Sequence, residues 1–193
     1  MALNVLILGP QGSGKGTQAK RISSEYGIPH VATGDMFRDA IARRAPLGLE
    51  VEPILASGRL VPDELTIELI RERLARDDAH AGFVLDGFPR NLAQAEALDA
   101  LLDEIGRPLS VVLELQIPDE IGIERMLRRA EIEGRSDDTP EVIARRLEIY
   151  HRETEPIVEH YLPSGKVVGI HGERTVAEVW AEIQDALEQA GTS

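Results

Sequence analysis

The chain contains no cysteine. Disulfide bridges and thiolate metal sites are therefore excluded. Its five histidines do not replace them, because His151 and His160, for example, are nine residues apart and would lie on opposite faces of a helix. We expect no zinc site.

Positive charge is also scarce. The formal net charge is −13, with 21 basic against 34 acidic residues. This balance disfavours non-specific binding to nucleic acid or to anionic membranes. An anion-binding site in such a chain must gather its positive charge locally. Arginine supplies 18 of the 21 basic residues and suits bidentate recognition of phosphate.

Long hydrophobic runs and targeting sequences are absent as well. Every apolar run is too short to span a bilayer, and no segment resembles a signal peptide. We therefore expect a cytoplasmic protein with no membrane partner. Nothing in the sequence suggests a long exposed apolar stripe, which favours a monomer.

Short apolar runs alternate with longer helical patterns, which predicts an α/β fold with a parallel sheet. The expected strands are residues 4–8, 30–32, 83–86, 110–117 and 166–170. Helical periodicity is clearest in two apolar stripes that we interpret as core faces. One contains Ala95, Leu98, Leu102 and Ile105, and the other contains Val176, Val179, Trp180, Ile183 and Leu187.

Two stretches depart from this alternation. Residues 33–82 form a connection longer than one crossover needs and are broken by several prolines and glycines, so part of them should form a small inserted lobe. Residues 134–138 are a polar, charged break between helical patterns at 119–133 and 140–160, and we expect a short mobile loop there.

The segment at residues 9–17, GPQGSGKGT, directly follows the first expected strand. Its glycines allow backbone N–H groups to converge on phosphate oxygens, while Lys15 and the following helix N-terminus add positive charge. The pattern G-x-x-x-x-G-K fits, but Gly16 follows the lysine and the hydroxyl comes one place late, at Thr17. This spacing argues against a direct bond between Thr17 and Mg²⁺. The alternative, a glycine-rich turn without a ligand, is disfavoured by the strand, lysine and helix around it.

Two further segments place polar residues after expected strands. Asp86 ends the strand at 83–86, so it should emerge near the phosphate loop, where a carboxylate can hold Mg²⁺ through water. The alternative is an ordinary Asp-Gly turn. Asp35 follows the second strand, and we interpret it as a helix N-cap one turn before Arg38. The bond before Pro89 is expected to be cis.

Arginines cluster near the charged break. Arg125, Arg128 and Arg129 share one side of the helix at 119–133. They either surround an anion or form a solvated face neutralised by neighbouring glutamates, and this motif alone favours the second interpretation. Arg135 and Arg146 flank the break and could close over a polyphosphate or form surface ion pairs. Many arginines, one lysine and no evident nucleophile together indicate phosphoryl transfer.

Taken together, these motifs make the chain resemble the adenylate kinases over essentially its full length. The matching segments are GPQGSGKGTQ (9–18), TGDMFR (33–38), GRLVPDEL (58–65), LDGFPR (85–90) with Gln94, and RSDD (135–138) with Arg146. The resemblance implies a P-loop NTPase-type three-layer sandwich whose five-stranded parallel sheet is flanked by helices. It also implies a core (1–31, 62–127 and 139–193), an NMP-binding lobe (32–61) and a short lid (128–138). Gln11 departs from the proline usual in the family.

The resemblance further implies reversible phosphoryl transfer from MgATP to AMP, which gives two ADP. It implies an ATP site of Gly12, Ser13, Gly14, Lys15, Gly16, Thr17, Arg125, Arg129, Gly172 and Arg174. The AMP site would contain Thr33, Arg38, Arg59, Leu60, Val61, Gly87, Phe88, Pro89, Arg90, Gln94, Arg135 and Arg146. Catalysis would fall to Lys15, Arg90, Arg129, Arg135 and Arg146, with Asp86 holding Mg²⁺ and no zinc.

Three other functions remain open at this point. The first is a UMP/CMP kinase of the same fold. Those kinases tend to have Ala and Asn where this chain has Thr33 and Gln94, so the resemblance favours adenine, and a glutamine amide can pair with adenine through one donor and one acceptor. The second is a sensor that binds adenine nucleotides without transfer, which would need only one of the two arginine-lined sides. An ATPase or switch GTPase is the third, and the guanine-reading Asn-Lys-x-Asp motif is absent.

Overall fold

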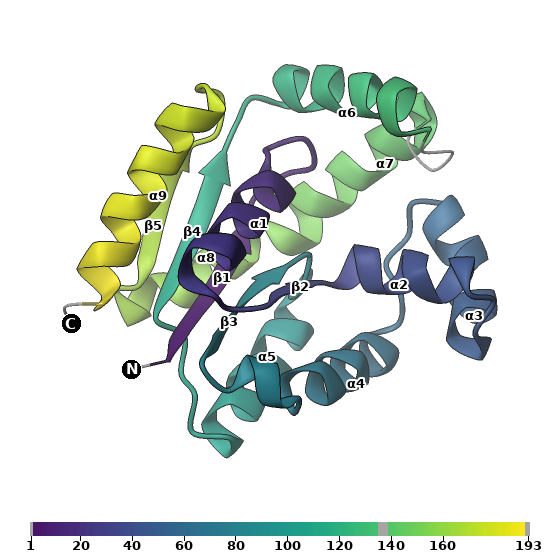
Figure 1. Cartoon of the computed structure of the whole chain (residues 1–193). Helices are drawn as coiled ribbons and strands as arrows, with labels where there is room; N and C mark the ends of the chain where they lie inside the picture. The colour runs from purple at the N-terminus through teal and green to yellow at the C-terminus, as the bar shows by residue number, and fades with distance from the viewer. Residues whose placement is uncertain (1, 135–138, 192–193) are drawn as a thin grey trace.

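A computed structural model describes residues 2–134 and 139–191 and contains one five-stranded parallel sheet (Figure 1). The strand order is β2-β3-β1-β4-β5. The strands are β1 (Leu3–Leu8), β2 (His30–Ala32), β3 (Gly82–Asp86), β4 (Val111–Gln116) and β5 (Val167–His171). The predicted α/β fold class and all five predicted strands are confirmed, with each end within one residue of its prediction.

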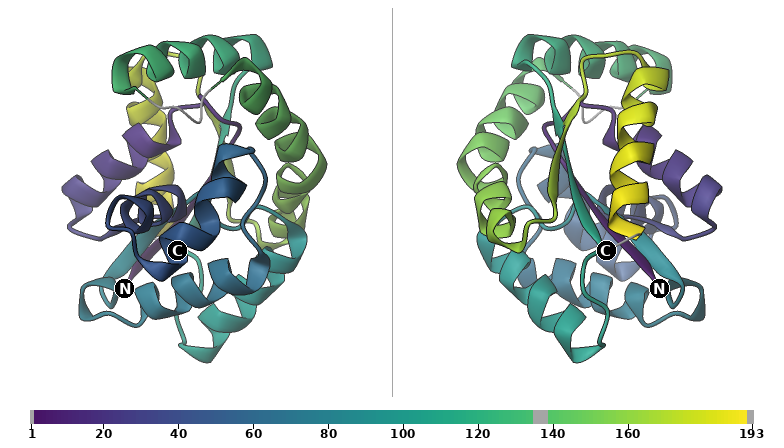
Figure 2. Two further views of the ribbon diagram at one scale, coloured as in Figure 1. Left: turned by 90° about the vertical axis from the view of Figure 1, so that its right-hand side faces the viewer. Right: turned by 90° about the vertical axis from the view of Figure 1, so that its left-hand side faces the viewer.

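Helices cover both faces of the sheet, which makes three layers (Figure 2). On one face lie α1 (Lys15–Tyr26) and α9 (Val176–Gly191), and on the other lie α4 (Asp63–Leu74), α5 (Leu92–Glu104) and α8 (Pro156–Tyr161). The remaining elements are α2 (Thr33–Ala42), α3 (Pro46–Ala56), η1 (Asp77–Ala79), α6 (Asp119–Glu133), α7 (Pro140–Ile149), η2 (Tyr150–Thr154) and η3 (Leu162–Ser164). No helix in the two described ranges is long and apolar enough to cross a membrane.

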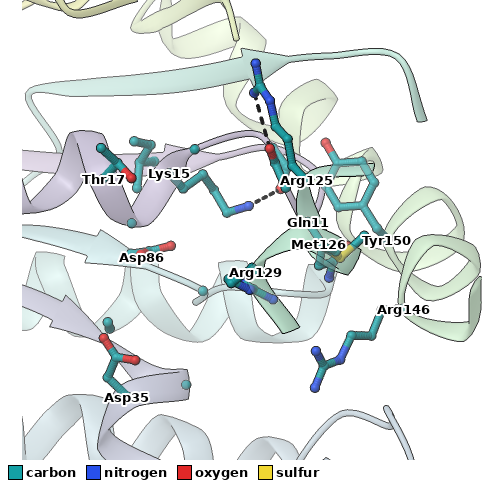
Figure 3. A pocket seen from close by; sticks show the side chains of 18 of the residues that line it. Gln11, Lys15, Thr17, Asp35, Asp86, Arg125, Met126, Arg129, Arg146 and Tyr150 are labelled. Atoms are coloured by element: carbon teal, nitrogen blue, oxygen red, sulfur yellow. Dashed lines mark hydrogen bonds between the residues drawn. The ribbon is translucent and has the colours of Figure 1, made fainter. Parts of the chain in front are cut away.

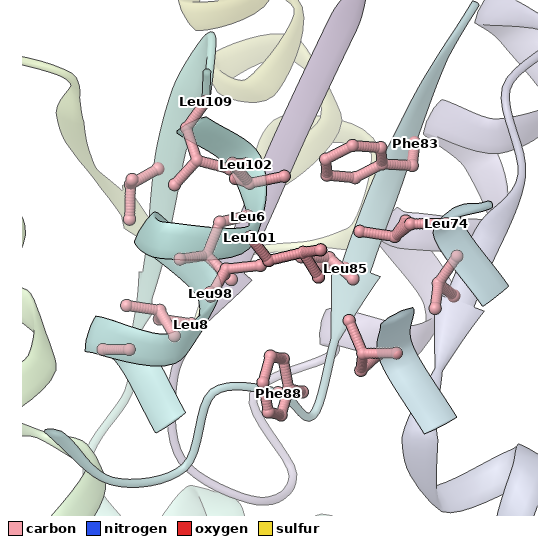
Figure 4. Close-up of a cluster of buried hydrophobic side chains, with 14 of the residues drawn as sticks. Leu6, Leu8, Leu74, Phe83, Leu85, Phe88, Leu98, Leu101, Leu102 and Leu109 are labelled. Atoms are coloured by element: carbon pink, nitrogen blue, oxygen red, sulfur yellow. The ribbon is translucent and has the colours of Figure 1, made fainter. Parts of the chain in front are cut away.

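Strand β1 shows how the sheet divides the core in two. Its side chains alternate between faces. Val5 and Ile7 join the cluster beneath α1 and α9, whereas Leu6 and Leu8 join the cluster beneath α4, α5 and α8 (Figure 4). Because both faces are covered, the strand reads as a continuous apolar run, as expected of a buried parallel strand.

The helix predicted over residues 140–160 is interrupted. Helix α7 passes into a π-helical turn, η2, in which the Glu155 N–H donates to the Tyr150 carbonyl at 2.9 Å. Pro156 begins α8. Because proline has no N–H, it cannot continue the regular hydrogen-bonding ladder, and the chain re-forms its helix after the wider turn. The prediction of one continuous helix was therefore wrong at this point.

Helices α2 and α3 form a small lobe with its own core of Phe37, Val51 and Val61. They cross at Gly48 of α3, where a Cβ atom would lie 2.2 Å from the Ala40 carbonyl oxygen of α2. This close approach of two backbones requires glycine, although the residue's own backbone conformation does not.

Replacing Gly48 with alanine is therefore expected to destabilise the protein by about 1–3 kcal/mol through overpacking. Urea unfolding measures the change. Gly191→Ala is the matched control, since a Cβ atom there meets nothing within 4 Å. Equal midpoints for the two variants would contradict the steric explanation.

Candidate active site

The loop between β1 and α1 has the expected phosphate-binding form. It occupies residues 9–14, and Gly12 and Gly14 have positive φ angles of 80° and 92°. Gly14 is the N-cap of α1 and provides no side-chain cap, so the first N–H groups of the helix have no capping side chain at this end. Such a terminus, preceded by a glycine-rich loop, is suited to bind an anion.

Gly12 also positions this loop against α6. A Cβ atom at Gly12 would lie 2.4 Å from the carbonyl oxygen of Gly122, so the two backbones are in close contact. Arg125, one turn further along α6, donates to the carbonyls of Gly172 at 2.8 Å and Gly12 at 3.3 Å. Helix α6 thus fixes an arginine beside the phosphate loop.

The ammonium of Lys15 lies inside the loop (Figure 3). It donates to the carbonyls of Gly9 at 2.6 Å and Pro10 at 2.8 Å. Burial lowers the pKa of Lys15 to about 8, while the nearby carboxylate of Asp86 raises it and Arg90 and Arg129 lower it further. The charged form of Lys15 is therefore disfavoured in the empty site, and an anionic ligand would stabilise it.

Asp86 emerges beside the loop, as predicted. A Cβ atom at Gly16 would be 3.6 Å from its Oδ2 atom. His30 on the neighbouring strand β2 lies within hydrogen-bond distance, with its Nε2 atom 3.1 Å from that same Oδ2. Burial alone would raise the pKa of Asp86, but the hydrogen bond with His30 and the charge of Lys15 lower it overall. Asp86 is therefore an ionised carboxylate whose Oδ2 atom is engaged by His30.

These groups open into a cleft of about 510 Å³ (Figure 3). Nine basic side chains line it against three acidic ones, although the chain as a whole carries a net charge of −13. The basic residues are Lys15, Lys20, Arg38, Arg59, Arg90, Arg125, Arg128, Arg129 and Arg146. All three arginines of α6 line this cleft, which favours the interpretation that they surround an anion over that of a solvated face.

Arg90 follows β3 and is held by groups from three other parts of the chain. Its N–H donates to Gln94 Oε1 at 2.8 Å, and its carbonyl accepts from the Thr154 hydroxyl at 2.7 Å. Its Nε donates to the Gly87 carbonyl at 2.8 Å. Burial and then the nearby charge of Arg146 lower the pKa of Arg90. Both peptide groups and the side chain are thus fixed before any ligand arrives.

A small side cavity of about 20 Å³ adjoins the cleft and shares Arg59, Gly87 and Arg90 with it. Its other predicted residues are Thr33, Leu60, Val61 and Gln94. The Thr33 hydroxyl donates to the Gly87 carbonyl at 2.8 Å, which ties the start of α2 to the loop after β3. The bond between Phe88 and Pro89 in that loop is cis, as expected.

Several predicted residues lie away from the cleft surface. The Phe88 side chain is buried in the core, and Ser13 is 2% exposed with its hydroxyl 3.4 Å from the Lys15 ammonium. Gly172 meets Arg125 through its carbonyl, and Arg174 pairs with Glu182. Arg135 lies outside the described residues.

Asp35 requires a correction. Ala32 is the N-cap of α2, and Asp35 lies in the first turn, where it pairs with Arg38 at 2.6 Å. The helix begins three residues earlier than predicted because residues 33–35 adopt helical conformation directly after β2. The carboxylate still complements the helix N-terminus from this position.

Three residues that support the site were not predicted. His30 reaches Asp86 because β2 and β3 are neighbours, a pairing that depends on strand order. Thr154 reaches Arg90 from 64 residues away, and no local pattern marks it. Asp63 accepts hydrogen bonds from Asn91 and Gln94 at 2.9 and 2.7 Å. Its place in the motif GRLVPDEL was the one available signal.

Comparisons with known proteins agree with this geometry. The family model for adenylate kinase matches residues 7–166. An adenylate kinase of Thermus thermophilus is 51% identical over 183 residues, which cover 95% of this chain and 96% of the relative. An adenylate kinase of a Cyanothece species is 49% identical over 185 residues, which cover 96% of this chain and 95% of the relative.

A more distant adenylate kinase, from Bacillus subtilis, is 37% identical, with 96% of this chain and 98% of the relative covered. The family model and these relatives extend over both the phosphate loop and the arginine-lined cleft. The chain therefore belongs to the adenylate kinase family of phosphotransferases, which convert ATP and AMP into two ADP.

Proposed function

We propose that the cleft holds ATP and AMP at once and transfers the γ-phosphoryl group directly between them. The observation that carries this proposal is the concentration of nine basic side chains around one cleft of an acidic protein. These side chains come from both the phosphate-loop side and the α2–α3 side. A metaphosphate-like transition state needs positioning and charge stabilisation rather than a protein nucleophile.

On the ATP side, the amides of Gly12, Gly14 and Gly16 and the Lys15 ammonium would bind the phosphates. Arg125 would lie against the adenine, and its bonds to the carbonyls of Gly12 and Gly172 support that placement. Ser13, Thr17, Arg129 and Arg174 complete the proposed set. The exposure of Arg174 and its pairing with Glu182 give it the weakest support among them.

On the AMP side, Arg38 and Arg90 would bind the monophosphate, and Gln94 would face the base. The proposed set also includes Thr33, Arg59, Leu60, Val61, Gly87, Phe88, Pro89, Arg135 and Arg146. Because the Phe88 side chain is in the core, only its main chain is available to a ligand. The side cavity of about 20 Å³ is smaller than a base, so AMP would enter with outward movement of the lobe.

Asp86 fits a magnesium site. It is a low-pKa carboxylate beside the phosphate loop, and oxygen ligands with retained water suit Mg²⁺. The ion, when bound with ATP, would neutralise charge on the β- and γ-phosphates. We propose no zinc requirement, since the chain lacks cysteine. In the described ranges no three His, Asp or Glu side chains are grouped to hold a metal.

We further propose that residues 32–61 act as the NMP-binding lobe and residues 128–138 as a short lid, with the rest as the core. The separate cluster of Phe37, Val51 and Val61 supports an independently moving lobe. Closure would exclude water and so suppress ATP hydrolysis. The monomeric state and the cytoplasmic location remain predictions.

An acceptor panel tests the proposed function. With MgATP as donor, AMP is expected to be used at least about 100-fold more efficiently than UMP, CMP or GMP, because a site that hydrogen-bonds one base rejects others. ADP should form only when both nucleotides are present. Preference for UMP or CMP would favour the pyrimidine kinase, and ATP binding without transfer would favour the sensor.

Replacing Lys15 with methionine is expected to lower kcat by about 10²–10³-fold, since one preorganised charge on the transferring group is lost. The midpoint temperature of thermal unfolding, Tm, should remain within a few degrees of the wild-type value. Lys166→Met is the control, because it removes an ammonium at the opposite end of the sheet, where Lys166 donates to the Leu109 carbonyl. Near-native turnover in Lys15→Met would show that the phosphate site lies elsewhere.

The lowered pKa of Lys15, about 8, also predicts a pH dependence. The protonated ammonium binds phosphate, and its fraction falls as the pH rises through 8 in the free enzyme. The value of kcat/KM for ATP is therefore expected to decline above about pH 8, approaching tenfold per pH unit. The decline in kcat should begin at a higher pH, because bound phosphates favour the ammonium. A kcat/KM that is constant to pH 10 would contradict this role.

A further inference from the structure

We propose that Asp63 fixes the orientation of the Gln94 side-chain amide. The binding site for the base of the acceptor nucleotide thereby selects a 6-aminopurine over a 6-oxopurine. The inference rests on the proposed function, in which Gln94 faces the base of the acceptor nucleotide. It adds a specificity-determining residue that does not itself touch the ligand.

Gln94 is 2% exposed and lines the small side cavity. Its Nε2 donates to Asp63 Oδ1 at 2.7 Å, and its Oε1 accepts from the Arg90 N–H at 2.8 Å. Both ends of the amide are therefore engaged by the protein. Asn91, the N-cap of α5, donates to the same Oδ1 at 2.9 Å and accepts from the Gln94 N–H at 2.9 Å.

The chemistry of the two partners determines which end of the amide is which. A carboxylate only accepts hydrogen bonds, and a backbone N–H only donates. A flipped Gln94 would place its oxygen against the Asp63 carboxylate and its NH₂ group against the Arg90 N–H. Both contacts would then be repulsive, so the network permits one orientation.

One N–H and one lone pair of the Gln94 amide remain for a ligand, in a fixed order. Adenine presents an amino donor at C6 beside an acceptor at N1, which matches an oxygen and an N–H in that order. A 6-oxopurine presents the reverse, an acceptor at C6 beside a donor at N1. An amide locked in one orientation therefore pairs with one edge and opposes the other, whereas an amide free to rotate accepts both.

The position of Asp63 allows it to hold the Gln94 amide in this orientation. It lies in the first turn of α4, while Asn91 and Gln94 lie at the start of α5. The carboxylate therefore joins the N-termini of the two helices next to the proposed binding site of the base. Asn91 holds the same oxygen from a second direction. The carboxylate therefore cannot turn away from Gln94 without losing both bonds.

The test compares AMP with inosine monophosphate, which differs at this edge alone, as acceptors for MgATP. In Asp63→Leu, which removes the acceptor atom, the ratio of kcat/KM for AMP to that for inosine monophosphate is expected to fall about fivefold or more. Asp63→Asn keeps an oxygen that can accept from Gln94, so its ratio should stay within about twofold of the wild type. Glu64→Gln, an exposed neighbour in the same turn, controls for lost helix-terminal charge.

A fall of less than about fivefold in the ratio for Asp63→Leu would overturn the inference, even if absolute activity drops, because a purely structural role of Asp63 would lower kcat/KM for both acceptors alike. A fall in Asp63→Asn or Glu64→Gln as large as in Asp63→Leu would overturn it too, since charge alone would then explain the effect. If Asp63→Leu does not fold, Asp63→Ala takes its place. A wild type that phosphorylates no monophosphate would instead refute the proposed function.

Discussion

The structure depends on a short, side-chain-poor turn between a buried strand and a helix. Within six residues the chain leaves β1, exposes a series of backbone amides and starts α1 with no capping side chain. Unsatisfied N–H groups and the helix dipole make that turn attractive to an anion. Lys15 adds a full charge whose pKa is already lowered by burial. The rest of the molecule places further cations around this point.

Those cations repel one another, and hydrogen bonds to neutral groups hold two of them in place. Arg125 donates to main-chain carbonyls, and Arg90 is fixed through its own peptide groups by Gln94 and Thr154. Among the described residues, three acidic side chains line the cleft against nine basic ones. Most of the acidic residues lie elsewhere, so a chain with a net charge of −13 still presents a positive cleft.

The proposed AMP side of the cleft uses a different kind of recognition, because a base is recognised by the direction of hydrogen bonds and not by charge. Asp63, Asn91 and Gln94 form a closed ring of three hydrogen bonds. The same network supports Arg90 through Gln94, so the arginine proposed to bind phosphate and the amide proposed to face the base share one support. The α2–α3 lobe has a small hydrophobic core of its own, separate from the two clusters on the sheet.

Local sequence determined the elements and the chemistry of the loops. The apolar runs predicted all five strands, and the glycine pattern with Lys15 predicted the phosphate loop, because both signals lie within a few consecutive residues. Tertiary structure alone decided which distant groups meet. Strand order brought His30 to Asp86, the turn η2 brought Thr154 to Arg90, and the packing of α4 on α5 oriented Gln94. Hydrogen bonds between segments depend on how the chain returns to one sheet edge, and no short stretch of sequence carries that information.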